Sequence, residues 1–195
     1  TFIEEITIAA TAQFGSVDGY RYWYVDAMAN LGSTGVSMGA VSLYGFGGGA
    51  WYHMKRSGSG PGGVPAEFAE ASPDGDTEPG VTNSGYRFVP DRGVDLGVRA
   101  MVTLGLSGSQ AVFNADVELV VTIEDGTLGE IALAGDFFML ADVPNRGRAI
   151  LNGAAEFRYV HPDRTFTGLF DINFDLTPFD VNIQMDLLFS PDEWH

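Results

Sequence analysis

One short stretch of the chain has carboxylates at the spacing of a cation-binding loop. Asp74, Asp76 and Glu78 stand at alternate positions in an acid-rich segment. Ca²⁺ takes several oxygen ligands, and alternate positions let one loop turn several of them toward the ion. The segment lacks the bidentate glutamate that completes an EF-hand loop. We therefore expect either a calcium site at these three residues or a solvated acidic loop.

A cluster of aromatic residues is the second candidate. Tyr20, Tyr22 and Tyr24 alternate along one stretch, and Trp51 belongs to a second aromatic stretch. If neighbouring strands bring these rings together, they form an exposed platform for a carbohydrate or a protein partner. The alternative is a second core on the other side of a sheet. The sequence leaves both arrangements open.

No residue pattern identifies catalytic groups. His53, His161 and His195 are far apart and have no metal-ligand spacing. Ser59 stands between glycines but lacks the strand and helix that surround a nucleophilic serine. The glycines within 45–49 have strand-like residues on both sides, whereas a phosphate loop precedes a helix. Catalytic residues therefore stay unknown, and a non-catalytic role is favoured over an enzyme.

The composition excludes several partners and cofactors. The chain has 26 acidic and 10 basic residues, a net charge of −16 and a pI near 4.2, so nucleic acid is not an expected partner. The lack of cysteine excludes disulfides and thiolate metal sites, and no cofactor besides Ca²⁺ is implied. No apolar run is long enough for a transmembrane helix. The acidity indicates either a surface adapted to high salt or calcium binding.

Alternation of apolar and polar residues dominates the chain and predicts an all-β protein. The clearest alternating stretches are 6–14, 23–31 and 98–106. We expect an antiparallel twisted sheet that forms a β-sandwich or a half-open β-barrel, with an apolar inner face and an acidic outer face. An outer-membrane barrel shows the same alternation, but its lumen would hold many carboxylates and few arginines to pair with them. A transmembrane segment is therefore not expected.

Two hairpins can be aligned from the sequence alone. A three-residue loop at 124–126 places Val121 opposite Gly129, with the apolar side chains of both strands on one face. The last two strands of the chain align in the same way through a two-residue link. That second alignment sets Asp175 opposite Asp180, a like-charge pair that costs stability.

The chain reads as a single β domain over residues 1–195. A segment rich in glycine, proline, serine and acids, at about 57–85, is interpreted as a long surface loop, because strands resume on both sides of it. Loops of this length are often functional. The chain starts at Thr1 and ends directly after a strand pattern, so we expect it to be a fragment of a larger chain.

Three stretches, 19–27, 43–54 and 189–194, resemble segments of very large uncharacterised β-rich proteins of Bacteroidota-type bacteria. The resemblance spans most of the chain and carries no active-site residues to transfer. It implies that the parent chain continues past His195 in another strand.

Together these patterns favour a non-catalytic structural or interaction module of a larger secreted or cell-surface protein. One alternative is a β module that encloses an apolar, lipid-like ligand. Others are a polysaccharide-acting hydrolase and a calcium-dependent adhesin domain. The expected partners are flanking domains of the parent chain or other proteins, with self-association through exposed strand edges.

Overall fold

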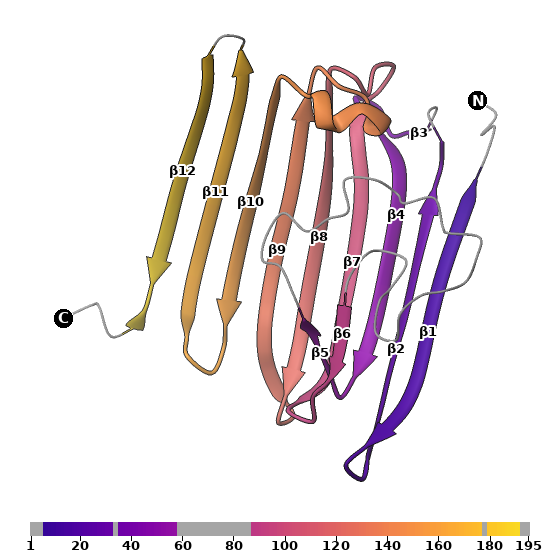
Figure 1. The fold of residues 1–195 in the computed structure, drawn as a ribbon, viewed down its shortest axis with the longest axis vertical. Helices are drawn as coiled ribbons and strands as arrows, with labels where there is room; N and C mark the ends of the chain where they lie inside the picture. The colour runs from indigo at the N-terminus through magenta and orange to yellow at the C-terminus, as the bar shows by residue number, and fades with distance from the viewer. Residues whose placement is uncertain (1–5, 33–34, 58–86, 177–178, 192–195) are drawn as a thin grey trace.

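The fold is built from one large antiparallel sheet (Figure 1). The computed structural model describes residues 6–32, 35–57, 87–176 and 179–191. The strand order is β1-β2-β4-β7-β8-β9-β10-β11-β12, so the all-β antiparallel fold predicted from the alternation is confirmed. The long strands are β1 (Thr7–Val17), β2 (Tyr20–Asn30), β4 (Val41–Tyr52), β7 (Val94–Leu106), β8 (Phe113–Glu124), β9 (Thr127–Met139), β10 (Leu151–Val160), β11 (Thr165–Leu176) and β12 (Phe179–Phe189).

Smaller elements lie beside these long strands. Strand β3 (Val36–Ser37) pairs with β4, and β5 (Met54–Ser57) forms a separate two-stranded hairpin with β6 (Arg87–Pro90). The 3₁₀ helix η1 (Val143–Arg148) connects β9 to β10. Figure 1 shows the β5–β6 hairpin in front of the sheet and η1 at the upper end of it. Both elements lie on the same side of the sheet, because each bonds side chains on one face of β8.

Tight turns join the strands at the lower end of the sheet in Figure 1. The β1–β2 turn has Asp18 at φ 49° and Gly19 at φ 82°, and the β8–β9 turn has Asp125 at φ 51° and Gly126 at φ 71°. Two consecutive residues with positive φ form the turn whose twist matches that of antiparallel strands. Aspartate and glycine tolerate this conformation, which explains why the hairpins close at these dipeptides.

The two hairpin alignments made from the sequence have different outcomes. In the β11–β12 pair Asp175 lies opposite Asp180, as predicted. In the β8–β9 pair Val121 lies opposite Ile131 and not opposite Gly129, so that alignment is wrong by two residues. The turn has two residues instead of the expected three, which by itself would shift the pairing by one residue and bring opposite faces together. An irregularity between Thr122 and Ile123 shifts the pairing by one residue more, so the apolar side chains of both strands still lie on one face.

Every long strand contributes to one continuous apolar face. We use the name apolar face for every second residue of 8–14, 23–29, 46–52, 98–106, 113–121, 131–139, 151–159, 166–174 and 179–189. The registers place these residues opposite one another from β1 to β12. All of them are aliphatic, aromatic, methionine, alanine or glycine. The opposite side of the sheet is called the polar face.

The apolar face is exposed and the polar face is largely buried, which corrects the expectation of an apolar inner and acidic outer face. On β7 the exposed residues Val98 and Ala100 alternate with the buried residues Gly97, Arg99 and Met101. Along β8, likewise, the side chains that reach deepest into the protein are polar. Alternation reveals that a sheet has two different faces, but it does not say which face the rest of the chain covers.

A small aromatic core fills the space between the polar face and the β5–β6 hairpin. It consists of Tyr24, Trp51, Met54, Phe88, Val94, Val120 and Ala132. The Phe88 ring lies 5.4 Å from the Tyr24 ring and 4.9 Å from the Trp51 ring, measured between centroids. A Cβ at Gly97 would come within 1.9 Å of the Trp51 ring, so glycine is what allows the indole to lie against β7.

Strands β1 and β12 stand at the two ends of the strand order in the described part of the chain, so the sheet is open there. The described residues contain no helix with the length and apolarity needed to cross a membrane.

Candidate functional surfaces

An ion-pair network is buried on the polar face between β2, β7, β8 and the β5–β6 hairpin. Arg99 on β7 donates to Asp26 Oδ2 through Nε at 2.9 Å and through Nη2 at 2.6 Å. Its Nη1 donates to Glu118 Oε2 at 2.8 Å, and Arg56 of the hairpin donates to the other oxygen of Glu118 at 2.7 Å. The Arg99, Asp26 and Glu118 side chains are at most 3% exposed. Two cations therefore neutralise two carboxylates inside the protein.

The 3₁₀ helix η1 supplies a second buried cation. Arg146 Nη1 and Nη2 donate to the two carboxylate oxygens of Asp116, and Arg146 Nε donates to Asn114 Oδ1 at 2.7 Å. Asn114 in turn donates to the Ala141 carbonyl at 2.7 Å. The Arg146 guanidinium also lies 4.6 Å from the centre of the Phe138 ring. These bonds anchor the connection between β9 and β10 on the polar face.

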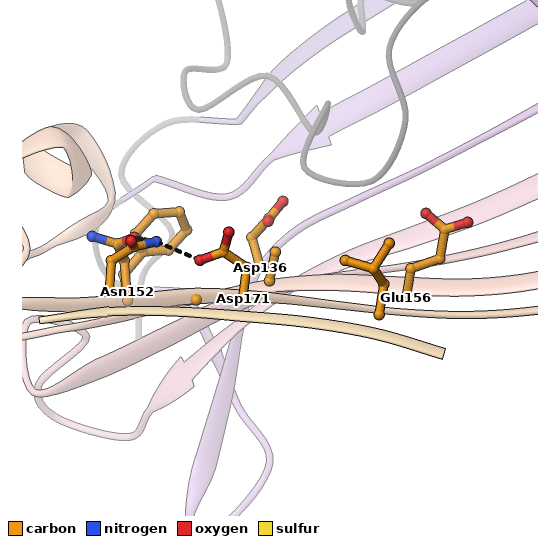
Figure 2. A pocket seen from close by; sticks show the side chains of 9 residues that line it. Asp136, Asn152, Glu156 and Asp171 are labelled. Carbon is orange, nitrogen blue, oxygen red and sulfur yellow. Dashed lines mark hydrogen bonds between the residues drawn. The ribbon is translucent and has the colours of Figure 1, made fainter. Parts of the chain in front are cut away.

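A pocket of about 270 Å³ continues the polar face toward β10 and β11. Figure 2 shows the side chains of Asp136, Asn152, Glu156 and Asp171 rising from the same side of the sheet into this pocket. Asp136 lies directly opposite Asp116, whose charge is already paired with Arg146. No hydrogen bond or ion pair of the Asp136 carboxylate is found among the residues that the structure describes. The pocket is therefore lined by acidic and amide side chains, and its charge disfavours an anion.

Beyond the pocket, polar side chains of the last two strands bind one another. Asn173 Nδ2 donates to Asp171 Oδ1 at 2.9 Å, and Asn182 Nδ2 donates to the same oxygen at 2.7 Å. Gln184 donates to Asp171 Oδ2 at 3.0 Å. These donors satisfy the Asp171 carboxylate without a cation. They remain partly or fully exposed, because the elements that cover β7 and β8 do not reach them.

The structure divides the predicted aromatic platform. Tyr20, Tyr22 and Tyr24 lie on the polar face as their alternation requires, and Tyr24 pairs with Trp51 across β2 and β4. Tyr24 and Trp51 are each 2% exposed beneath the β5–β6 hairpin. Tyr20 and Tyr22 are half-buried, and Tyr20 makes an edge contact with His53 at 5.5 Å. Two of the four rings thus belong to the core.

The predicted calcium ligands Asp74, Asp76 and Glu78 lie outside the described residues, as does most of the predicted loop at about 57–85. Within the described ranges, no group of three or more histidine or acidic side chains is placed to hold a metal ion. The calcium site therefore stays a prediction.

The apolar face is the surface that sequence reasoning assigned to the interior. Its large side chains are exposed at both ends and in the middle of the sheet, with Phe14 at 73% on β1, Leu119 at 43% on β8 and Ile183 at 52% on β12, and they are half-buried on β10 and β11. Its tryptophan and tyrosine residues, Trp23, Tyr52 and Tyr159, all lie toward the strand ends that the tight turns join. The signal that sequence reasoning missed is Arg99, which stands between apolar residues of a strand, together with Arg146 in the short connection between β9 and β10.

Comparisons with protein families, with curated proteins and with solved structures found no match.

Proposed function

We propose that this chain is a non-catalytic interaction module of a larger secreted or cell-surface protein, and that its apolar face binds an apolar partner. One observation carries the proposal. Among the described residues, the β5–β6 hairpin and the 3₁₀ helix cover the polar face over its central strands, whereas the large side chains of the opposite, wholly apolar face stay exposed.

The size of this face supports a binding role. Nine strands spaced about 4.8 Å apart and about 35 Å long give a flat area of roughly 1,300 Å². The largest apolar patch of a typical monomer is about 300–600 Å². A stable interface buries about 800 Å² per partner, so this face is large enough to hold one.

The energetics support the same proposal. Full burial of one exposed leucine, isoleucine or phenylalanine side chain is worth about 1.5–3 kcal/mol. Exposed side chains of these types stand on the face from Ile8 on β1 to Phe189 on β12. A partner that covers only part of the face would therefore gain enough free energy to bind.

The buried networks explain how the opposite face can be the interior. Arg99 and Arg146 place a positive charge against Asp26, Glu118 and Asp116, so burying these carboxylates does not leave them unpaired. A shortage of arginines to pair with enclosed carboxylates is the reason that the sequence disfavours an outer-membrane barrel. With the pairs formed, the acid-rich side can face the covering elements while the apolar side faces a partner.

The test is the binding of an environment-sensitive apolar dye to the folded chain, compared with two lysine variants. Leu119→Lys places a charge in the middle of the apolar face, and we expect at least roughly tenfold weaker dye binding, because an ammonium group resists desolvation. Gln184→Lys adds the same charge on the polar face of β12 and should leave dye binding unchanged. Equal binding by all three proteins would overturn the proposal.

A further inference from the structure

We propose that the partner of the apolar face is the acyl-chain region of a lipid bilayer, and that the nine long strands cross it. This inference rests on the proposed function, since it names the partner that the apolar face binds. Four features of the described chain separate acyl chains from a protein partner: the composition of the face, the length of the strands, the placement of the Tyr and Trp residues, and the burial of charge behind the face.

The composition of the apolar face suits hydrocarbon. Protein interfaces usually surround an apolar centre with a polar rim. This face stays apolar from β1 to β12, and no charged residue belongs to it as defined above. Beyond its end on β2 stands Arg21, an exposed residue whose side chain is long enough to reach a headgroup. An apolar surface of this extent, with a cation only beyond its end, matches the acyl-chain region of a bilayer and the headgroups beside it.

The strands have the length that a bilayer requires. The long strands contain 10 to 13 residues. A tilted strand of about 9–11 residues crosses a hydrocarbon layer of about 30 Å. In Figure 1 the strand ends lie higher at β12 than at β1, as they do when strands lean relative to a common plane.

The Tyr and Trp side chains mark one boundary of the layer. Trp23 and Tyr52 stack on neighbouring strands with ring centroids 6.3 Å apart, and Tyr159 lies near the same end of β10. Rings with a polar atom collect where hydrocarbon meets headgroups. At the opposite ends Phe113 begins β8 and Phe179 begins β12. Aliphatic residues, alanine and glycine make up most of the face between these ends.

The polar face meets the last requirement of a sheet in a bilayer, which is that charged groups lie away from the acyl chains. Charged groups cannot face acyl chains without a large cost, and carboxylates behind the sheet need partners. The Arg99 and Arg146 networks provide these partners on the side away from the apolar face. Backbone groups at the outer edges of β1 and β12 also need partners in hydrocarbon, so on the vesicles these edges have to pair with the edge strands of further copies of the chain.

The experiment is a depth measurement with fluorophores on single cysteines, which is direct because the chain has no cysteine of its own. The labelled positions are Leu119 and Ile183 near the strand centres, Phe14 and Phe189 near the strand ends, and Gln184 on the polar face of β12. Each protein is bound to phosphatidylcholine vesicles whose acyl chains carry bromine either near the headgroup or near the methyl end.

We expect labels at Leu119 and Ile183 to be quenched roughly twofold more by deep bromine than by shallow bromine, and labels at Phe14 and Phe189 to show the reverse order. The label at Gln184, next to Ile183 but on the other face, should be quenched little by either. Two central positions guard against one variant that fails to fold, which circular dichroism would detect.

The contradicting outcomes separate this inference from the proposed function. Equal quenching of all apolar-face labels by shallow bromine means that the sheet lies flat and overturns the crossing. Labels that become buried only as protein concentration rises, without quenching by lipid, identify a second copy as the partner and overturn the lipid assignment alone. Labels that remain in water under every condition overturn both proposals.

Discussion

The two faces of this sheet are made by the same strands but differ in charge and in exposure. The polar face buries Asp26, Asp116 and Glu118, whose charges are neutralised at short distance by Arg99, Arg146 and Arg56 of the hairpin. The apolar face needs no internal partner and is left open. The difference teaches that burial inside a chain follows from what the covering elements can satisfy, and that hydrophobicity alone does not decide which side of a sheet is the interior.

The largest loss of stability is expected from removing the central cation of the polar face, Arg99. Arg99→Met removes the charge that lies between Asp26 and Glu118, both of which are buried. An uncompensated buried charge costs about 3–5 kcal/mol, so the free energy of unfolding should fall by that amount. Urea titration followed by circular dichroism measures it. Arg92→Met, at an exposed position, is the matched control and should change stability by no more than about 0.5 kcal/mol.

A second test overfills the core beneath the β5–β6 hairpin. Gly97→Ala places a methyl group in the volume of the Trp51 ring, and overpacking of this kind costs about 1–3 kcal/mol. The melting temperature should drop and the tryptophan emission should shift as the ring moves. Gly147→Ala is the control, because nothing lies within 4 Å of a Cβ at that position. A Gly97 variant as stable as wild type would show that the indole is not held between sheet and hairpin.

Neighbouring residues of β8 sharpen the comparison, because they point to opposite faces. Val120 is 5% exposed and Leu119 is 43% exposed. In lipid-free solution Val120→Ala should cost about 2 kcal/mol, since it removes buried methyl groups, whereas Leu119→Ala should cost less than about 1 kcal/mol although it removes more carbon. Denaturant midpoints of the two variants decide the matter. The reverse order of stabilities would mean that the two faces have been assigned the wrong way round.

The smallest effect concerns the ion pair that fixes one side of the hairpin. Lys55 Nζ lies 2.9 Å from Asp91, and the hydrogen bonds from Lys55 and from the Gly93 amide lower the pKa of the Asp91 carboxyl below its usual value. A carboxyl with a lowered folded-state pKa contributes stability above its unfolded pKa and loses it as the pH falls through the folded pKa. The stability difference between wild type and Asp91→Asn should therefore shrink in acid. If the stability difference stayed constant as the pH fell through the folded-state pKa of Asp91, the ion pair would be excluded as the cause of that difference.

Much of the fold could be predicted from the sequence, because alternation is a local property of each strand. It identified strands such as 98–106 and placed the apolar side chains of neighbouring strands on a common face. It also aligned β11 with β12 correctly. The β8–β9 alignment was wrong because one irregular residue pair and a tighter turn at Asp125 and Gly126 cannot be distinguished from a longer loop by pattern alone.

The functional surfaces could not be predicted in the same way. Which face is covered depends on the β5–β6 hairpin and η1, whose positions are set by contacts far apart in the sequence. Arg99 is separated from Asp26 by 73 residues, and Arg146 from Asp116 by 30, so neither pair leaves a local motif. The acidity of the chain was visible, but the partners of its buried acids were not.

The most direct test of the central claim, that the apolar face is outside and the polar face inside, is the reaction of single cysteines with a water-soluble maleimide. In β9 the exposed residues Ile131 and Leu133 flank Ala132, which is 4% exposed. In the lipid-free folded chain, cysteines at 131 and 133 should react about tenfold faster than a cysteine at 132, which reacts only when the structure opens. Equal rates, or faster reaction at 132, would contradict the account.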